Sequence, residues 1–210
     1  SILIQLDTDP KPSVFDRVVA VDAGVDRLFS YGGVCPESVE SLVHGAIFTR
    51  GVSELAHTAI FVGGSDVEAG EAVFEAVQRA FFGPMRVSLM MDSNGCNTTA
   101  AAAVLRARRH VELSETIAVV LGGTGPVGRR AAELLVREGA RVRLGSRSAE
   151  RAGATCEAIA QGVPGAELEP VATGEASAMA EALEGAVVLI AAGATGVQLV
   201  STDAREALGE

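Results

Sequence analysis

The chain has 210 residues, of which 48% are hydrophobic, so it can bury the core of one large domain or of two small ones. Its formal net charge of −10 argues against nucleic acid or an anionic membrane as a partner, because the overall field repels polyanions. No apolar run approaches the roughly twenty residues that span a bilayer, and the first residues lack the basic and apolar regions of a signal peptide.

Cysteine and histidine are sparse and widely spaced. The three cysteines fit neither a disulfide framework nor a zinc site, and the three histidines show no ligand spacing. These residues are Cys35, Cys96, Cys156, His44, His57 and His110. We therefore expect reduced thiols, a cytoplasmic location and no metal centre.

The first ninety residues alternate between predicted strands and helices. A strand at 2–6 ends in a polar, proline-marked loop at 7–13, and Ser13 can cap a helix at 14–21. The elements expected next are a strand at 27–31, a helix from Pro36 to about His44, an ambiguous stretch at 46–49, a strand at 57–62, a helix at 67–82 and a strand at 85–91. This alternation predicts an α/β lobe.

A dense set of hydrogen-bonding side chains follows at 92–99, where the sequence DSNGCNTT leads into an alanine-rich helix ending near His110. A loop with an N-cap explains one or two of the six polar residues, so we favour a ligand-facing loop. The arginine-rich stretch 106–115 is the expected junction between two domains, 1–105 and 106–210.

The stretch 116–148 carries the most specific signal. An apolar, β-branched run at 117–121 is typical of a buried parallel strand, and the sequence GTGPVG at 123–128 has the spacing G-x-G-x-x-G. A helical pattern, a stop at Gly139 and a second strand at 141–144 follow, as in a dinucleotide-binding βαβ unit. There the glycines allow a tight turn, approach of the pyrophosphate and close packing of a helix whose N-terminus attracts phosphate.

The end of the second strand indicates which dinucleotide binds. An NAD site usually places an acidic residue there, whereas this chain reads GSRS at 145–148 and has no acid before Glu150. The guanidinium of Arg147 suits a 2′-phosphate, and the hydroxyls of Ser146 and Ser148 can add donors, so we predict NADP, with NAD possible. The alternative is that Arg147 is a solvated surface residue and Ser148 caps the next helix.

The second lobe continues with a helix at 149–160, a strand at 167–171, a helix at 176–183, a strand at 186–192 and a helix at 203–208. The end of the strand at 186–192 is expected at the same sheet edge as Gly123. A six-stranded doubly wound sheet needs about two more strands, so either the sequence is a fragment or this lobe is reduced, and we expect the domain to be truncated at its C-terminus. The predicted fold class is α/β, with an N-terminal α/β domain and a Rossmann-type doubly wound parallel-sheet domain.

Several blocks occur in one order: DTD at 7–9 with PSVFD at 12–16, TAIFVGG at 58–64, FFGP at 81–84, DSNG at 92–95 with NTTAA at 97–101, and GTGPVG at 123–128. Together they resemble the NAD(P)-dependent methylene-tetrahydromethanopterin dehydrogenase family over nearly the whole chain. The resemblance implies oxidation of N5,N10-methylene-tetrahydromethanopterin to the methenyl form, with hydride passed to NADP and in some members to NAD. It also implies a fold related to methylene-tetrahydrofolate dehydrogenases, a pterin one-carbon carrier bound between the lobes, a homo-oligomer and longer family chains.

The implied hydride transfer agrees with the small number of candidate catalytic residues, because hydride leaving a carbon between two nitrogens gives a cation that a nitrogen lone pair stabilises. No catalytic acid, base or metal is required. The expected positioning residues, able to hold pterin N–H groups or favour the developing charge, are Asp7, Asp9 and Asp92. Further substrate contacts are expected from Ser93, Asn94, Asn97 and Thr98. Cofactor contacts are expected from Gly123, Thr124, Gly125, Pro126, Val127, Gly128, Ser146, Arg147, Ser148, Ala192 and Gly193.

Two alternatives remain. One is a dehydrogenase of methylene-tetrahydrofolate, whose reactive centre is nearly the same. The other is a non-catalytic NADP-binding or regulatory protein, which binding without turnover would distinguish.

Overall fold

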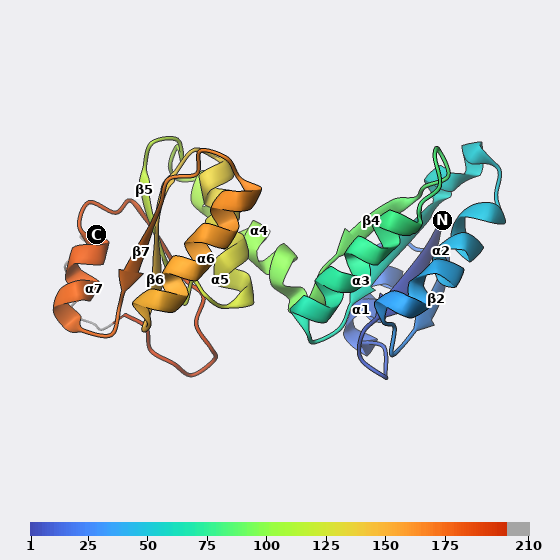
Figure 1. Cartoon of the computed structure of the whole chain (residues 1–210), viewed down its shortest axis with the longest axis horizontal. Helices are drawn as coiled ribbons and strands as arrows, with labels where there is room; N and C mark the ends of the chain where they lie inside the picture. The colour runs from blue at the N-terminus through green and yellow to red at the C-terminus, as the bar shows by residue number, and fades with distance from the viewer. Residues whose placement is uncertain (201–210) are drawn as a thin grey trace. The chain divides into compact units, whose positions relative to one another are not determined.

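The computed structural model describes residues 1–200, and the chain divides into two compact units, Ser1–Cys96 and Asn97–Glu210. Each unit holds one four-stranded sheet with helices (Figure 1). All the strand pairs are parallel, which confirms the α/β class and the Rossmann-type second domain. The division between the units precedes almost all of helix α4 (Cys96–Arg108), whereas the sequence suggested a junction at the basic end of this helix.

The sheet of the first unit has the strand order β2-β1-β3-β4. Its strands are β1 (Ile2–Asp7), β2 (Arg27–Tyr31), β3 (Thr58–Gly63) and β4 (Ser88–Met91). The chain changes direction across the sheet between β1 and β3, whose last residues, Asp7 and Gly63, are paired in register. Open parallel sheets bind ligands at such a switch point, beyond the carboxyl ends of the strands.

One face of this sheet is covered by α2 (Val39–Phe48) and α3 (Val67–Ala80). The alternate strand residues Leu6, Ile60 and Val62 are buried against these helices, as the two-residue period of a strand requires. Helix α1 (Val14–Asp22) contacts β2 and has no buried residue. Short 3-10 helices lie at Pro36–Ser38, Val52–His57 and Ser93–Gly95.

The sheet of the second unit has the order β7-β6-β5-β8. Its strands are β5 (Ile117–Leu121), β6 (Arg141–Ser146), β7 (Leu168–Ala172) and β8 (Val188–Ala191). Residues of α4, α5 (Pro126–Arg137) and α6 (Ala149–Gly162) build the larger core on one face, and α7 (Ala176–Leu183) contributes to a smaller core on the other. The switch point lies between β5 and β8, next to the glycine loop.

Several predicted elements have different limits in the structure. The helix expected at 67–82 ends at Ala80 and the strand expected at 85–91 begins at Ser88, because Phe82 and Met85 close a tight turn by exchanging backbone hydrogen bonds. The ambiguous stretch 46–49 provides the last turn of α2. The helix expected at 203–208 lies outside the described residues. Within residues 1–200, every helix is too short or too polar to cross a bilayer.

Candidate functional site

Asp7 ends β1 with a fully buried side chain. Its Oδ1 accepts a hydrogen bond from the backbone N–H of Asp9 (2.9 Å), and its Oδ2 accepts from the backbone N–H of Ser13 (2.9 Å). The side-chain amide of Gln5 donates a further bond to Oδ2 (3.3 Å). A buried carboxylate needs such donors to offset the loss of water. Asp7 therefore holds the loop 8–13 and the start of α1 in place.

Asp9 joins this loop to the one that follows β3. Its carboxylate accepts from the backbone N–H of Ser65 (3.0 Å) and from the Ser65 hydroxyl (2.8 Å). Gly64, with a φ of +112°, permits the contact, because a Cβ at this position would run into the side chain of Thr8. The two loops thus form one continuous surface at the switch point.

Asp16 is a third carboxylate at this surface and was missed as a site residue. Its Oδ2 lies 3.2 Å from the position that a Cβ on Gly63 would take, and Oδ2 of Asp7 lies 3.5 Å from the same position. Partial burial raises the pKa of Asp16; a hydrogen bond with Ser13 opposes the shift, and the charges of Asp7 and Asp92 add to it. The available signal was the capping spacing S-x-x-D at 13–16, since the Ser13 hydroxyl accepts from the Asp16 N–H (3.2 Å).

The residues after β4 reach the same edge of the sheet. The backbone N–H of Asp92 donates to the carbonyl of Val62 (3.0 Å), and the buried Ser93 hydroxyl donates to the carbonyl of Gly63 (3.2 Å). Asn94 takes a left-handed conformation, with a φ of +55°, and its N–H donates to the carbonyl of Gly64 (2.7 Å). We call Asp7, Asp9, Asp16 and Asp92 the acidic edge.

The sequence suggested that Asn97 and Thr98 lie in a loop, but the structure places them in a helix. Both belong to the first turn of α4, and the contacts of the chain place them with the second unit. The loop predicted at 92–99 is therefore only its first half, which the short helix Ser93–Gly95 fills.

The glycines in the loop of the second unit differ in how much room each has for a side chain. A Cβ on Gly123 would lie 2.5 Å from Cγ of Leu144, and a Cβ on Gly128 would run into the carbonyl of Gly122 and lie 2.8 Å from Cα of Gly123. By contrast, the nearest atom to a Cβ on Gly125 is the Gly122 carbonyl oxygen at 3.4 Å. Gly123 and Gly128 thus serve the fold, while Gly125 leaves room in front of the loop.

The start of α5 faces this room. Gly125 is the N-cap and Pro126 the first helical residue, so no side chain among the described residues caps the helix. The unpaired N–H groups of a first turn bind phosphate well. Thr124 completes the loop and Val127 packs against the core. Beside them, the Ala192 N–H donates to the carbonyl of Leu121 (2.8 Å), which brings the stretch 192–193 to the same switch point.

Arg147 follows β6 and is exposed. Within residues 1–200 its side chain has no hydrogen bond or ion pair, so the guanidinium is available to an anion. Ser146 accepts from the N–H of Ser148 (3.3 Å), and Ser148 caps α6 by accepting from the N–H of Arg151 (3.3 Å). Both hydroxyls act as acceptors in these bonds and keep a proton to donate.

Comparisons with known proteins cover most of the chain. The family model described as Methylene-tetrahydromethanopterin dehydrogenase, N-terminal, matches residues 14–94. The bifunctional protein MdtA of Methylorubrum extorquens is 47% identical over 201 residues, which are 95% of this chain and 69% of that protein. The NAD(P)-dependent methylenetetrahydromethanopterin dehydrogenase of the same organism is 30% identical over 209 residues, which are 97% of this chain and 70% of that protein.

A solved structure supports the fold. Quinate dehydrogenase from Corynebacterium glutamicum, in complex with NAD, matches with a TM-score of 0.52. The match covers 97% of this chain and 76% of the quinate dehydrogenase chain. The two sequences are only 14% identical, so the likeness concerns the fold alone.

Proposed function

Because the chain belongs to the methylene-tetrahydromethanopterin dehydrogenase family, we propose that it oxidises N5,N10-methylene-tetrahydromethanopterin to the methenyl form, with a nicotinamide dinucleotide as hydride acceptor. The observation that carries the proposal is the 47% identity over 95% of the chain. The methylene-tetrahydrofolate reading and the non-catalytic reading have no comparable support. The geometry of both switch points fits the proposed reaction.

The glycine loop fits a dinucleotide. The space in front of Gly125, which a Cβ would narrow, meets the uncapped start of α5, so backbone N–H groups can hold the pyrophosphate. Residues 123–128 and 192–193 would form this cradle. When bound, the nicotinamide ring supplies the site that accepts a hydride.

We propose NADP as the preferred dinucleotide. Arg147 offers a planar, permanently charged fork for the 2′-phosphate, and Ser146 and Ser148 can add O–H donors. The serines' bonds to backbone N–H groups hold both hydroxyls next to Arg147 without using their protons. The name of the second relative allows NAD as well.

The acidic edge is the proposed pterin side of the reaction. The C–H bond of the methylene carbon breaks with both electrons leaving in the hydride, so no proton moves and the pterin becomes a cation. A carboxylate nearby favours that charge. Asp16 is the group we propose for this role, with the charge of Asp92 adding to its own, because Asp7 accepts from backbone N–H groups of its loop and Asp9 accepts from Ser65.

The other residues of the edge position these groups. Asp7 fixes the loop that presents Asp16, while Ser93 and Asn94 hold the turn that carries Asp92. We also keep Asn97 and Thr98, in the first turn of α4, as proposed pterin contacts.

We propose in addition that the protein forms a homo-oligomer. Helix α1 exposes five large apolar side chains, including 76% of Phe15, and such a patch marks an interaction surface. Sedimentation of the purified chain over a range of concentrations tests this point. A monomer at all concentrations would refute it.

The experiment that tests the reaction is absorbance-monitored reduction of NADP and of NAD, with methylene-tetrahydromethanopterin and methylene-tetrahydrofolate supplied separately. We expect rapid NADPH formation with the methanopterin. Faster turnover with the folate would replace the proposed substrate. NADP binding in a parallel titration without turnover on either pterin would favour the non-catalytic reading.

A further inference from the structure

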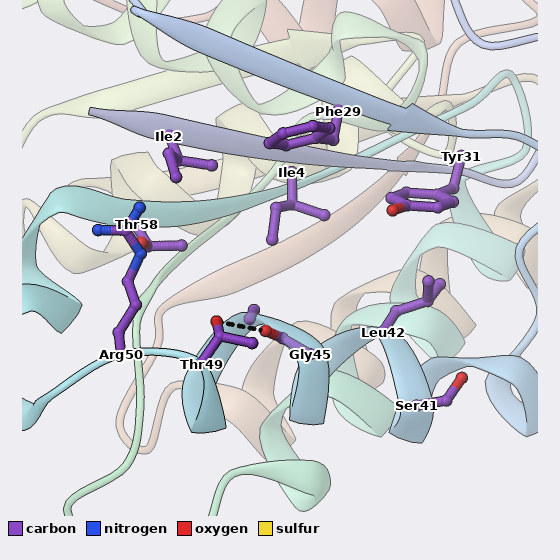
Figure 2. Close-up of a pocket in the computed structure, with 11 residues that line it drawn as sticks. Ile2, Ile4, Phe29, Tyr31, Ser41, Leu42, Gly45, Thr49, Arg50 and Thr58 are labelled. Carbon is purple, nitrogen blue, oxygen red and sulfur yellow. Dashed lines mark hydrogen bonds between the residues drawn. The ribbon is translucent and has the colours of Figure 1, made fainter.

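A pocket of about 270 Å³ lies in the first unit, between the sheet and α2 (Figure 2). Ile4 of β1, Phe29 of β2 and Gly45 of α2 contribute to its lining. No residue of the acidic edge lines it, so the pocket is separate from the site proposed for the pterin.

The pocket exists because α2 lacks a side chain where it faces β1 and β2. A Cβ on Gly45 would have no heavy atom within 4 Å. The Thr49 hydroxyl does not reach into the gap, since it donates to the carbonyl of Gly45 (2.8 Å; Figure 2). A glycine within a helix lowers its stability, so this gap is maintained at a cost to the fold.

One end of the pocket carries a positive charge without a partner. Arg50 is the only charged residue among the described residues that line the pocket, and it makes no hydrogen bond or ion pair within residues 1–200. Figure 2 shows its guanidinium extending towards Thr58. Thr58 is 3% exposed, and its hydroxyl oxygen has no hydrogen-bond partner within the described part of the chain. A buried hydroxyl left unpaired is unfavourable, so this end is incomplete without a ligand.

The rest of the pocket is apolar along the strands. Ile2 pairs with Thr58 and Leu6 pairs with Tyr31, so Thr58 and Tyr31 are offset along the strand direction by four residues of β1, or roughly 13 Å. Between them lie Ile4 and Phe29, as Figure 2 shows. The volume falls just below the range of roughly 300–1,000 Å³ for pockets that hold drug-sized ligands, so the occupant is small.

We propose that this pocket binds a small monocarboxylate with an aromatic or short aliphatic body. The carboxylate pairs with Arg50, whose fork-shaped donors match its geometry, and accepts from the Thr58 hydroxyl after a rotation about χ1. The apolar body fills the space over Gly45. The proposal does not rest on the dehydrogenase reaction.

Calorimetry and ligand-observed NMR with phenylacetate as the probe test this proposal on the whole chain. We expect saturable binding that weakens about tenfold or more in Arg50→Gln, because hydrogen bonds to a charged group are lost. Phenylacetamide, which has the same body without the charge, should bind about tenfold or more weakly as well. Gly45→Leu should abolish binding by filling the gap, whereas Gly45→Ala is the matched control and should retain it.

Three outcomes would overturn the proposal. One is the absence of saturable phenylacetate binding, and another is binding that Arg50→Gln and Gly45→Leu leave unchanged. The third is concentration-dependent self-association that Gly45→Leu removes and phenylacetate does not affect, since this would assign the pocket to a second copy of the chain. Circular dichroism of each variant shows whether it is folded.

Discussion

Alanine at Gly125 and alanine at Gly128 should have different effects on stability, although both residues belong to the same loop. At Gly128 the new Cβ meets the carbonyl of Gly122 and Cα of Gly123, and backbone atoms cannot turn aside as a side chain does. Overpacking of this kind costs roughly 1–3 kcal/mol of unfolding free energy. At Gly125 the new Cβ keeps 3.4 Å to its nearest neighbour, and the backbone, with φ −81° and ψ 165°, suits alanine.

Gly125→Ala should therefore be as stable as the parent chain or up to about 1 kcal/mol more stable, because the unfolded chain loses freedom. Its cofactor affinity should fall, since the Cβ occupies the approach of the pyrophosphate. Loss of one charge-assisted hydrogen bond, about 1.5–3 kcal/mol, weakens binding roughly 10- to 150-fold.

Urea unfolding followed by circular dichroism measures the stability of each variant, and calorimetric titration with NADP measures its cofactor affinity. Gly128→Ala should lose both stability and binding. The reasoning is refuted if Gly125→Ala is destabilised as much as Gly128→Ala, or if it binds NADP as tightly as the parent chain.

Three further variants test other contacts. Arg147→Gln should raise the KM for NADP about tenfold or more and leave that for NAD nearly unchanged, as steady-state kinetics would show; equal effects on both would remove Arg147 from the 2′-phosphate site. Asp16→Asn should lower pterin turnover about tenfold or more with NADP binding intact. Because the pKa of Asp16 is raised in the folded state, its ionisation lowers the free energy of unfolding, and this loss is relieved as pH falls through the folded-state pKa towards 3.8. Asp16→Asn should therefore be more stable than the parent chain at pH 7 and should not gain this stability on acidification, as urea unfolding at several pH values would show. Partial burial opposes ionisation of Glu133, but Arg137 and Arg130 hold its pKa below 4.5. The ionised Glu133 therefore stabilises the fold above pH 4.5, and this stabilisation is lost as pH falls through the folded-state pKa. Glu133→Gln should cost roughly 0.5–1 kcal/mol at pH 7 in the same assay and little at low pH.

The sequence was informative wherever local backbone geometry determines the outcome. The glycine loop is the best example, because the spacing of Gly123 and Gly128 follows from a strand turning directly into a helix. The buried strands were also recognisable, since their apolar runs are short and bounded by turn residues.

The sequence was less informative wherever contacts between distant segments are required. Asp16 looked like an ordinary first-turn residue of a helix, and its neighbourhood depends on Gly63, which follows it by almost fifty positions. Asp7 looked like a ligand-facing carboxylate, but two backbone N–H groups hold it inside the fold. The pocket over Gly45 could not be expected either, because an isolated glycine in a helix does not show what lies opposite.

The strand orders of the two sheets have a consequence for how ligands are sorted. Each unit opens a binding edge at its switch point, but the first is ringed by carboxylates, while the second presents bare glycine backbone and the start of a helix. The carboxylates of the first would repel a polyphosphate and the helix start of the second would attract it, while the first would favour the positive charge that the proposed reaction develops on a pterin. On the proposed assignment of ligands, the two related scaffolds thus differ in the sign of the charge that each favours.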